Sequence, residues 1–400
     1  MQPLEITAGT AISAMGRGVD ATLDALRTRR SGLRPTDFGG IAEGHIGRVD
    51  GVEAHALPAA LAKYDCRNNR LADMALNTDG FSSAVAEARA HYGADRVAVV
   101  LGTSTSGILS GEDAYRDRDP DTGRLPAGFD HEHTQDLFSL ARYVRAVLDL
   151  RGPAFVVSTA CASASKSFID AHHLIEAGVC DAAVVGGADS LCRMTMRGFA
   201  ALELISPSPC RPCDAARTGI SIGEAAGFAL LERSGARPAG SQSGIRASML
   251  GHGASSDGHH MSSPHPRGEG AILAMRQALA RAGLEPGAID YINLHGTGTR
   301  ANDAMEDVAV TELFGAATDC SSTKGWTGHT LGASGILETM IAALCITHGF
   351  KPGCLGVSQV DPAFRSKVLF DNLEGPVHRV MSNSFGFGGI NCSLIFGPAA

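Results

Sequence analysis

The chain has 400 residues, of which 44% are hydrophobic, 19% charged and 5% aromatic, and its formal net charge is −8. This apolar content excludes a disordered chain, and the acidic balance argues against a nucleic-acid partner. A single hydrophobic core stops growing at about 250–300 residues, so we expect two domains.

No apolar stretch of about 18 residues stands out, so no membrane span is expected. The N-terminus lacks a basic segment followed by an apolar one, so a secretory signal is not expected either. Ten cysteines in such a chain predict free thiols in a cytoplasmic protein rather than a disulfide framework. Cys210 and Cys213 form a CxxC pair, but no second pair follows at metal-ligand spacing, so we expect no metal site.

Short β-branched runs alternate with longer Ala-rich amphipathic stretches along the chain. This alternation predicts mostly parallel sheets with helices on their faces. The segment 234–244 is rich in Gly, Ser and Pro and reads as a linker, so we predict halves spanning 1–240 and 241–400. The expected strands are 96–101, 154–158, 181–186, 227–231, 291–294, 379–381 and 392–396, and the expected helices include 271–282 and 336–346.

Cys161 lies where a predicted strand meets a helix that runs to Gly178. The positive end of a helix dipole lowers the pKa of a thiol there and favours the nucleophilic thiolate. A buried structural cysteine is the simpler interpretation of this turn alone.

Two loops with histidines strengthen the catalytic interpretation. His295 directly follows a strand, at the edge where α/β sheets place their active sites, and Thr297 and Thr299 follow it. Lys324 and His329 are separated by glycines, and Glu338 stands in the apolar helix after them. A buried carboxylate needs a partner, and Lys324 is a candidate, unless Glu338 faces water.

A Gly-rich segment, 383–391, joins the last two predicted strands. Its glycines allow a substrate to approach closely, and its N–H groups could form an oxyanion site, although an ordinary hairpin would have the same pattern. Lys63, Arg67 and Arg70 form a small basic cluster, which a solvated helix face would also explain.

Taken together, the ordered motifs Thr159-Ala-Cys161, His295-Gly-Thr-Gly-Thr, Lys324 to His329, Gly332-Ala-Ser-Gly335 and Asn383-Ser-Phe-Gly-Phe-Gly-Gly resemble the thiolase-superfamily condensing enzymes. The closest resemblance is to β-ketoacyl-acyl-carrier-protein synthases of the elongating type. It implies an α/β thiolase-like fold with two βαβαβ halves stacked in five layers, α-β-α-β-α. It also implies a dimer.

The resemblance implies a role for each motif. Cys161 carries the acyl chain as a thioester, and His295 and His329 stabilise the enolate formed when malonyl-carrier protein loses carbon dioxide. Lys324 and Glu338 support the histidines, and no cofactor is needed. The remaining implied roles are an oxyanion hole from the N–H groups of Cys161 and Phe385, substrate contacts from Thr297, Thr299, Phe199, Phe385 and Phe387, and carrier-protein docking by Arg67, Arg70 and Lys63.

Some features depart from the common fatty-acid enzymes. Trp326 stands in the loop between Lys324 and His329, and the segments 65–73 and 162–166 are more similar to single-domain ketosynthases of aryl-polyene clusters. One hypothesis is that Trp326 shapes a pocket for a rigid conjugated chain.

Three alternatives remain at this point. The chain could be the catalytic subunit of a heterodimer with a chain-length-factor homologue rather than a homodimer. A thiolase would need a second active-site cysteine, and Cys392 lies inside a predicted strand. A cysteine hydrolase would pair Cys161 with His295 and Asn302, but it leaves Lys324 and His329 unexplained.

Overall fold

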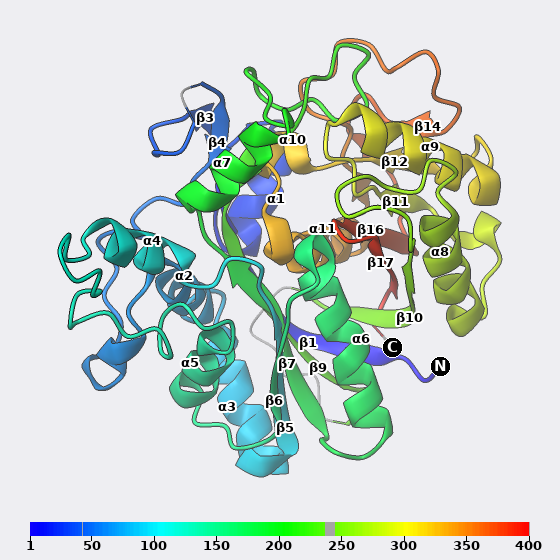
Figure 1. Cartoon of the computed structure of the whole chain (residues 1–400). Coiled ribbons are helices and arrows are strands. Elements are labelled where there is room, and N and C mark those ends of the chain that lie inside the picture. Colours follow the sequence, from blue (N-terminus) through cyan, green and yellow to red (C-terminus); the bar gives the residue numbers. More distant parts are fainter. Residues whose placement is uncertain (42, 237–244, 400) are drawn as a thin grey trace.

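A computed structural model describes residues 1–41, 43–236 and 245–399. Two sheets with the same topology build the molecule (Figure 1). The N-terminal sheet has the strand order β1-β9-β7-β5-β6, in which β7–β5 and β5–β6 are parallel and β1–β9 and β9–β7 are antiparallel. Its strands are β1 (Leu4–Ser13), β5 (Val97–Gly102), β6 (Ala154–Val157), β7 (Ala182–Asp189) and β9 (Ala225–Arg233).

The C-terminal sheet repeats this order as β10-β17-β16-β11-β12, with β14 added at its edge. The β10–β17 and β17–β16 pairs are antiparallel, whereas β16–β11 and β11–β12 are parallel. The two sheets join where the start of β1 pairs with the start of β10. The strands are β10 (Ala247–Ser256), β11 (Tyr291–Asn293), β12 (Asp319–Ser321), β14 (Lys367–Val368), β16 (Val380–Gly386) and β17 (Ile390–Gly397).

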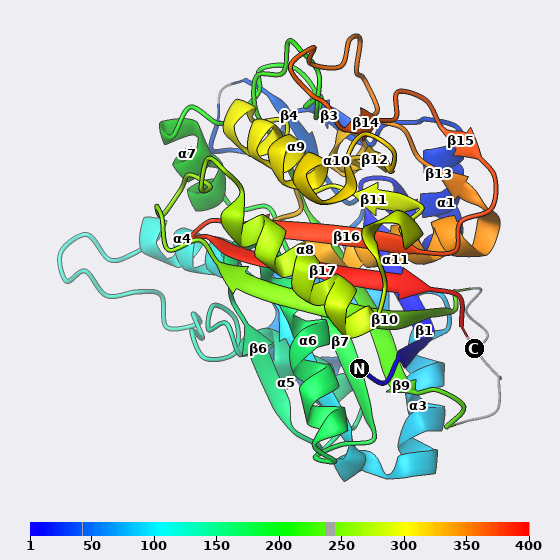
Figure 2. The same cartoon turned by 90° about the vertical axis from the view of Figure 1, so that its right-hand side faces the viewer.

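Helices fill the space between the sheets and cover both outer faces, which gives the predicted α-β-α-β-α layers (Figures 1 and 2). The middle layer holds α6 (Ser163–Glu176) and α11 (Ser334–His348), which contact each other and strands of both sheets. The outer N-terminal layer contains α2 (Arg67–Leu76), α3 (Phe81–Tyr92) and α5 (Ser139–Val147). The outer C-terminal layer contains α8 (Glu269–Ala282) and α9 (Arg300–Phe314).

The two middle helices begin in the same way. A short 3-10 turn precedes each of them. Ala160–Ala162 follows β6 and leads into α6, and Leu331–Ala333 leads into α11 after β12 and the short helix α10 (Lys324–Thr327). Ala160 (φ +49°) and Leu331 (φ +52°) open these turns in the left-handed region, which side chains other than glycine rarely adopt. Both helix N-termini therefore lie at the carboxyl ends of parallel strands, on the same side of the molecule.

Smaller elements complete the chain. A three-stranded sheet and a two-stranded sheet lie outside the main sheets. The first contains β3 (Leu33–Pro35), β4 (His45–Gly47) and β8 (Ile222–Gly223), and the second contains β13 (Phe350–Lys351) and β15 (Leu373–Glu374). Strand β2 (Gly16–Arg17) pairs with β1. The remaining α-helices of the described residues are α1 (Val19–Arg27), α4 (Ile108–Arg116), α7 (Arg193–Ala201) and α10 (Lys324–Thr327).

All seven predicted strands and both predicted helices are present, with ends shifted by a few residues. The expectation of mostly parallel sheets was wrong, because half of the pairings among the five main strands of each half are antiparallel. A tight connection such as Gly386 to Ile390 can join only antiparallel strands, since a parallel pair needs a long crossover. The predicted linker and domain boundary fall mostly on residues 237–244, outside the described residues.

One segment, Leu331–His348, is long and apolar enough to cross a membrane by length and composition alone. This corrects the expectation that no such stretch exists. However, 83% of the segment is buried inside the protein. It forms the central helix α11 together with the turn before it, and its apolar character is explained by its place between two sheets.

Candidate active site

Cys161 lies in the turn between β6 and α6, as the sequence predicts. The left-handed conformation of Ala160 turns the chain sharply, and the helix that follows ends at Glu176, two residues before Gly178. Only 5% of Cys161 is exposed. The thiol therefore lies at a helix N-terminus but is largely removed from bulk water.

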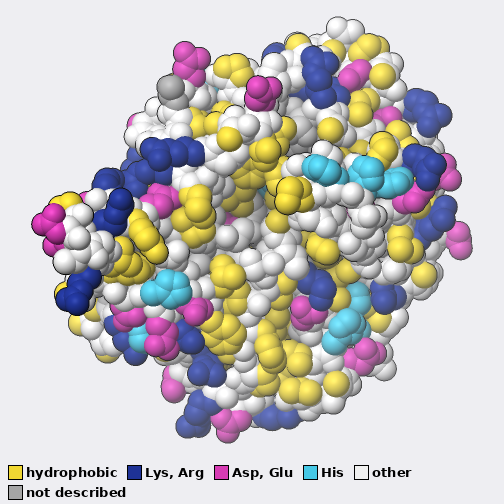
Figure 3. Space-filling model, in the orientation of Figure 1, with side chains coloured by type: hydrophobic (Ala, Val, Ile, Leu, Met, Phe, Trp, Pro, Cys, Tyr) yellow, Lys and Arg dark blue, Asp and Glu magenta, His cyan; other side chains and the backbone are white. Residues whose placement is uncertain are grey.

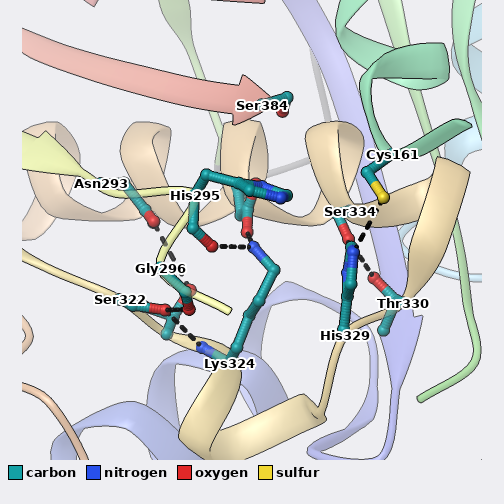
Figure 4. A network of polar contacts seen from close by, with 12 residues as sticks. Cys161, Asn293, His295, Gly296, Ser322, Lys324, His329, Thr330, Ser334 and Ser384 are labelled. Atoms are coloured by element: carbon teal, nitrogen blue, oxygen red, sulfur yellow. Dashed lines mark hydrogen bonds and ion pairs between the residues drawn. The ribbon is translucent and has the colours of Figure 1, made fainter. Parts of the chain in front are cut away.

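Two imidazoles from the C-terminal half approach this thiol (Figure 4). His329 Nε2 lies 2.9 Å from Cys161 Sγ, and His329 Nδ1 lies 3.1 Å from the hydroxyl of Ser334. The His295 ring is 5.3 Å from the His329 ring, centroid to centroid. Ligand atoms of all three side chains lie within 4.8 Å of one another, so segments far apart in sequence form one cluster.

Lys324 and Glu338 form a buried ion pair beside the histidines. Lys324 Nζ lies 2.5 Å from Glu338 Oε1 and donates a hydrogen bond of 2.6 Å to the carbonyl oxygen of His295. Their side chains are 2% and 4% exposed. The predicted pairing is confirmed, and Glu338 does not face water.

Burial lowers the pKa values of His295 and His329 well below the usual range, and the Lys324 ammonium lowers them further. Both rings are therefore neutral at pH 7, and each can donate one hydrogen bond from N–H. His295 Nδ1 is buried without a hydrogen-bond partner among the described residues. This leaves a polar atom available to a ligand.

Two carboxylates that sequence reasoning missed hold the site together. Glu306 on α9 accepts hydrogen bonds of 2.8 Å from the backbone N–H groups of His295 and Gly296. Asp189, at the end of β7, accepts from Ser104 and Thr105 in the N-terminal half and from the N–H of Gly332 in the C-terminal half. Asp189 lies 143 positions from Gly332, whereas Glu306 lies only 11 positions from His295, on the helix that follows the His295 loop. A single charged residue in a helix or strand gives no sign of such a role.

A pocket with an empty volume of about 760 Å³ opens onto Cys161, His295 and His329. The predicted substrate contacts Thr297, Thr299, Phe199, Phe385 and Phe387 all line it. The rings of Phe199 and Phe387 are 5.5 Å apart, and the hydroxyls of Thr297 and Thr299 are 3.0 Å apart. Aromatic and hydroxyl groups therefore share a pocket that ends at the thiol.

Comparison with known proteins agrees with this geometry. Residues 1–236 match the N-terminal domain of the β-ketoacyl synthases, and residues 246–358 match the C-terminal domain. The chain belongs to the β-ketoacyl synthase family. It is a ketosynthase similar to the 3-oxoacyl-[acyl-carrier-protein] synthase 2 of Rhizobium meliloti, at 37% identity over 81% of this chain and 78% of the relative. A mitochondrial 3-oxoacyl-[acyl-carrier-protein] synthase from Arabidopsis thaliana is 40% identical over 62% of this chain, which spans 56% of that relative.

Solved ketosynthases share the fold over the whole chain. The ketosynthase ApeO from Xenorhabdus doucetiae, solved in complex with its chain length factor ApeC, is 40% identical with a TM-score of 0.89, covering 100% of this chain and 98% of that one. The ishigamide ketosynthase/chain length factor is 28% identical with a TM-score of 0.87, covering 100% of both chains. The thiolase-like fold expected from the sequence is thus shown.

The N–H groups that face the thiol of this ketosynthase differ in part from those expected. They belong to Cys161 itself and to Phe387, rather than to Phe385. Phe385 is the last-but-one residue of β16, and its ring lies 6.0 Å from that of His295. The strand ends at Gly386, and the tight connection that follows turns the next amide toward the thiol.

Trp326 does not line the pocket, contrary to the hypothesis that it shapes the acyl site. Its side chain is fully buried in the core, and its indole N–H donates a 3.1 Å hydrogen bond to the carbonyl oxygen of Ala25 in α1. α10 turns the indole away from the cavity while Lys324, two residues earlier, faces the histidines. The bulk of Trp326 supports the packing of α1 against the C-terminal half.

The basic cluster is not a free docking surface. Arg67 is buried and forms a bidentate pair with the fully buried Glu224, at 2.7 and 2.6 Å. Arg70 binds Asp65 through two hydrogen bonds, and only Lys63 stays exposed. Neither carrier docking nor a solvated helix face describes Arg67, because its charge is satisfied inside the protein, whereas carrier docking by Lys63 and Arg70 stays a prediction.

The pH dependence of Cys161 reactivity follows from its burial. Burial raises the pKa of the Cys161 thiol to about 11, although Lys324 and the N–H groups of Phe387 and Cys161 lower it in part. This outweighs the helix-dipole effect expected from the sequence. We expect the rate of alkylation by iodoacetamide to rise about tenfold per pH unit from pH 6.5 to 9, because the thiolate fraction rises in that way. Intact-mass spectrometry of samples quenched at timed intervals measures the alkylation rate. A rate that stops rising above pH 7 would contradict a raised pKa.

Gly386 is needed for the close approach of the Gly-rich turn to the nucleophile. A Cβ at this position would lie 2.9 Å from the carbonyl oxygen of Thr159 and 3.2 Å from the amide nitrogen of Cys161. We expect Gly386→Ala to push the turn away and slow acyl loading more than about tenfold, since an oxyanion-hole donor is worth a factor of about 10²–10³. The matched control is Gly287→Ala, where nothing lies within 4 Å. Equal loading by both variants would contradict this role of the turn.

Proposed function

We propose that this ketosynthase joins a malonyl unit to an acyl chain held as a thioester on Cys161, and that carbon dioxide release drives the step. The observation that carries the proposal is the 2.9 Å contact between Cys161 Sγ and a neutral His329, with His295 beside it. A hydrolase would leave the second histidine and the buried Lys324–Glu338 pair without a purpose. A thiolase would need a second cysteine in the site, and Cys392 is fully buried in β17 and absent from the pocket lining.

In the loading step, the Cys161 thiol passes its proton to His329 Nε2 as sulfur attacks the thioester carbonyl of an acyl-carrier protein. The N–H groups of Cys161 and Phe387 stabilise the oxyanion. The carbonyl then re-forms, the carrier thiolate leaves, and it takes the proton from His329. The enzyme holds the acyl thioester, and His329 is neutral again.

In the condensing step, the malonyl-carrier thioester occupies the same pocket. Once Cys161 is acylated, no S–H group competes for His329 Nε2, so N–H groups of both imidazoles can bind the malonyl thioester oxygen. They stabilise the enolate formed as the C–C bond to the carboxylate breaks and carbon dioxide leaves. The enolate carbon attacks the acyl thioester, the bond to Cys161 sulfur breaks, and the product is a β-ketoacyl-carrier thioester. Cys161 leaves as a thiolate and takes a proton from water, which restores the thiol. In this scheme Thr297 and Thr299 contact the pantetheine arm, and no redox cofactor takes part.

The proposal includes a partner subunit. The structures of ApeO and of the ishigamide ketosynthase each include a chain length factor, and this chain matches them over its whole length. Strand β6 is the outer strand of the N-terminal sheet, and Phe155 on it is 47% exposed. An exposed strand edge with a large apolar side chain is suited to pairing with a homologous subunit. Because this chain holds the complete Cys-His-His set, it would be the catalytic member.

The proposed acyl substrate is a conjugated chain of the aryl-polyene type, which rests on the resemblance of segments 65–73 and 162–166. The aromatic pair Phe199 and Phe387, with Leu204 and Ile220, gives the pocket an apolar wall beside the thiol. Flat conjugated chains stack on such rings.

A cytoplasmic location belongs to the same proposal, since all ten cysteines are free and buried as expected in a reducing compartment.

An intact-mass assay tests the proposal. The protein, alone and with a co-expressed chain-length-factor homologue, is mixed with malonyl-carrier protein and with saturated, unsaturated or aryl-conjugated acyl-carrier proteins. We expect Cys161 acylation by the protein alone, and elongation of conjugated primers when the partner is present. Elongation of saturated primers by the protein alone would overturn both the partner and the substrate class. Failure of Cys161 to become acylated would overturn the reaction.

A further inference from the structure

A second group of imidazoles lies at the other end of the nucleophile-bearing helix. His172 and His173 are on α6, and His252 is on β10 of the other half. One ligand atom of each lies within 4.8 Å of the others. His172 and His252 are buried, whereas His173 is exposed. Figure 3 shows histidine side chains at the surface where α6 and β10 meet.

The spacing of these nitrogens is that of ligands on one ion. His252 Nε2 lies 3.3 Å from His172 Nδ1. Two nitrogens at about 2.0–2.1 Å from a tetrahedral Zn²⁺ are separated by about 3.3–3.4 Å, so the two nitrogens need not move, although the hydrogen in the hydrogen bond between them must leave. A fourth ligand is close: Glu176 Oε2 lies 3.8 Å from His172 Nδ1, one helical turn further along α6.

The two buried rings are in the protonation state that binds metals. Burial lowers the pKa of His252 to about 3, and the neighbouring His172, Arg281 and His173 lower it further. Burial also lowers the pKa of His172. Neutral imidazole is the ligand form of histidine. His252 Nδ1 is buried without a hydrogen-bond partner among the described residues, so hydrogen bonds within the chain leave this ring incompletely satisfied.

An ion can reach the cluster from solvent. A pocket lined by Gln2, Leu4, His172, Ile175, Glu176 and Arg233 opens beside it. Both His173 and Glu176 are exposed, so they can adjust toward an ion without a change in the core. The buried residues His172 and His252 thus provide the fixed part of the site. The exposed residues His173 and Glu176 provide its adaptable part.

We propose that His172, His173, His252 and Glu176 bind one divalent transition-metal ion of the Zn²⁺ class. The ion links α6 of the N-terminal half to β10 of the C-terminal half. His172 lies nine residues beyond the start of α6, about 14 Å along the helix, so the site is separate from the thiol and has a structural role.

Cobalt binding to the protein tests the site. The protein is treated with a chelator, loaded with Co²⁺ and freed of unbound ion, and the retained metal is measured by mass spectrometry and by visible absorption. We expect one Co²⁺ per chain, tetrahedral ligand-field bands and no sulfur-to-cobalt charge-transfer band, because Cys161 is not a ligand. We also expect Zn²⁺ to raise the midpoint of thermal unfolding by at least about 2 °C.

His173→Gln and Glu176→Gln are the informative variants, since both residues are exposed and their replacement leaves the core intact. We expect each to weaken Co²⁺ binding more than about tenfold and to reduce the Zn²⁺-dependent rise in the unfolding midpoint. His91→Gln, an exposed histidine of α3, is the matched control and should bind as the unchanged protein does.

Three results would overturn the proposal. One is no retained cobalt in the unchanged protein. The second is full retention in His173→Gln. The third is a sulfur-to-cobalt band that disappears when Cys161 is alkylated, which would place the ion on Cys161, His295 and His329, the second cluster with suitable spacing among the described residues.

Discussion

Cys161→Ala is expected to abolish acyl loading, with a loss of more than about 10³-fold, while carbon dioxide release from malonyl-carrier protein continues. The thiol is the atom that carries the acyl chain, whereas the decarboxylation needs only hydrogen bonds from His295 and His329. Loss of the thiol removes its contact with the His329 ring, but the His329–Ser334 hydrogen bond and the Lys324 hydrogen bond to the backbone of His295 remain. Removing the thiol therefore separates the two half-reactions. Intact-mass spectrometry measures acyl loading, and release of labelled carbon dioxide measures decarboxylation.

Cys392→Ala is the matched control for this experiment. Cys392 is fully buried in β17, and it is the residue that a thiolase interpretation would use. We expect the control to keep both loading and decarboxylation. Acylation of the Cys161→Ala protein, or loss of loading in Cys392→Ala at unchanged stability, would move the nucleophile away from Cys161.

Lys324→Met is expected to lower the free energy of unfolding by about 3–5 kcal/mol and to reduce condensation strongly. The substitution leaves the Glu338 carboxylate buried without its cation, which is the costly case for an ion pair. It also removes the donor to the His295 carbonyl, so the His295 loop loses an anchor. Urea unfolding measures the first effect, and the elongation assay measures the second. The matched control is Lys367→Met, because Lys367 is 53% exposed beside Asp319 and its loss should cost less than about 1 kcal/mol.

The loss of unfolding free energy in Lys324→Met should increase with pH. Burial raises the pKa of Glu338 above its usual value even with Lys324 present. Without the Lys324 cation the pKa of Glu338 in the folded state rises further. The destabilisation by the buried carboxylate is therefore small below the unfolded-state pKa of about 4.5, and it grows as the pH rises through the folded-state pKa. We expect Lys324→Met to lose more unfolding free energy, relative to the unchanged protein, at pH 8 than at pH 5.5. The double variant Lys324→Met/Glu338→Leu should recover stability at pH 8 but not activity. A pH-independent deficit would mean that Glu338 is not the group left unpaired.

The sequence predicted well what depends on local patterns. Each strand-to-helix turn, the buried strands and the Gly-rich hairpin follow from hydrophobic periodicity and glycine placement within short windows. The Lys324–Glu338 pair was also predictable, because a charged residue in an apolar helix must find a partner near in the fold.

Features that depend on partners far apart in the chain were not predictable. Arg67 looked like part of a basic surface, but its partner Glu224 lies 157 positions away and both are buried. Trp326 stands two residues from Lys324, yet α10 directs its indole into the core. Asp189 belongs to the site only because the two halves fold against each other, since its partner Gly332 lies 143 positions away.

The repeated turn at the start of α6 and α11 has a consequence for how activity arises. Equivalent positions in the two turns hold Cys161 in one half and Gly332 in the other, and the thiol of the first half meets the imidazoles of the second. Neither half produced alone would contain a complete reaction centre, and each would expose an apolar middle helix. Catalysis in this protein therefore depends on two halves of the same topology, one of which supplies the nucleophile and the other the hydrogen-bonding imidazoles.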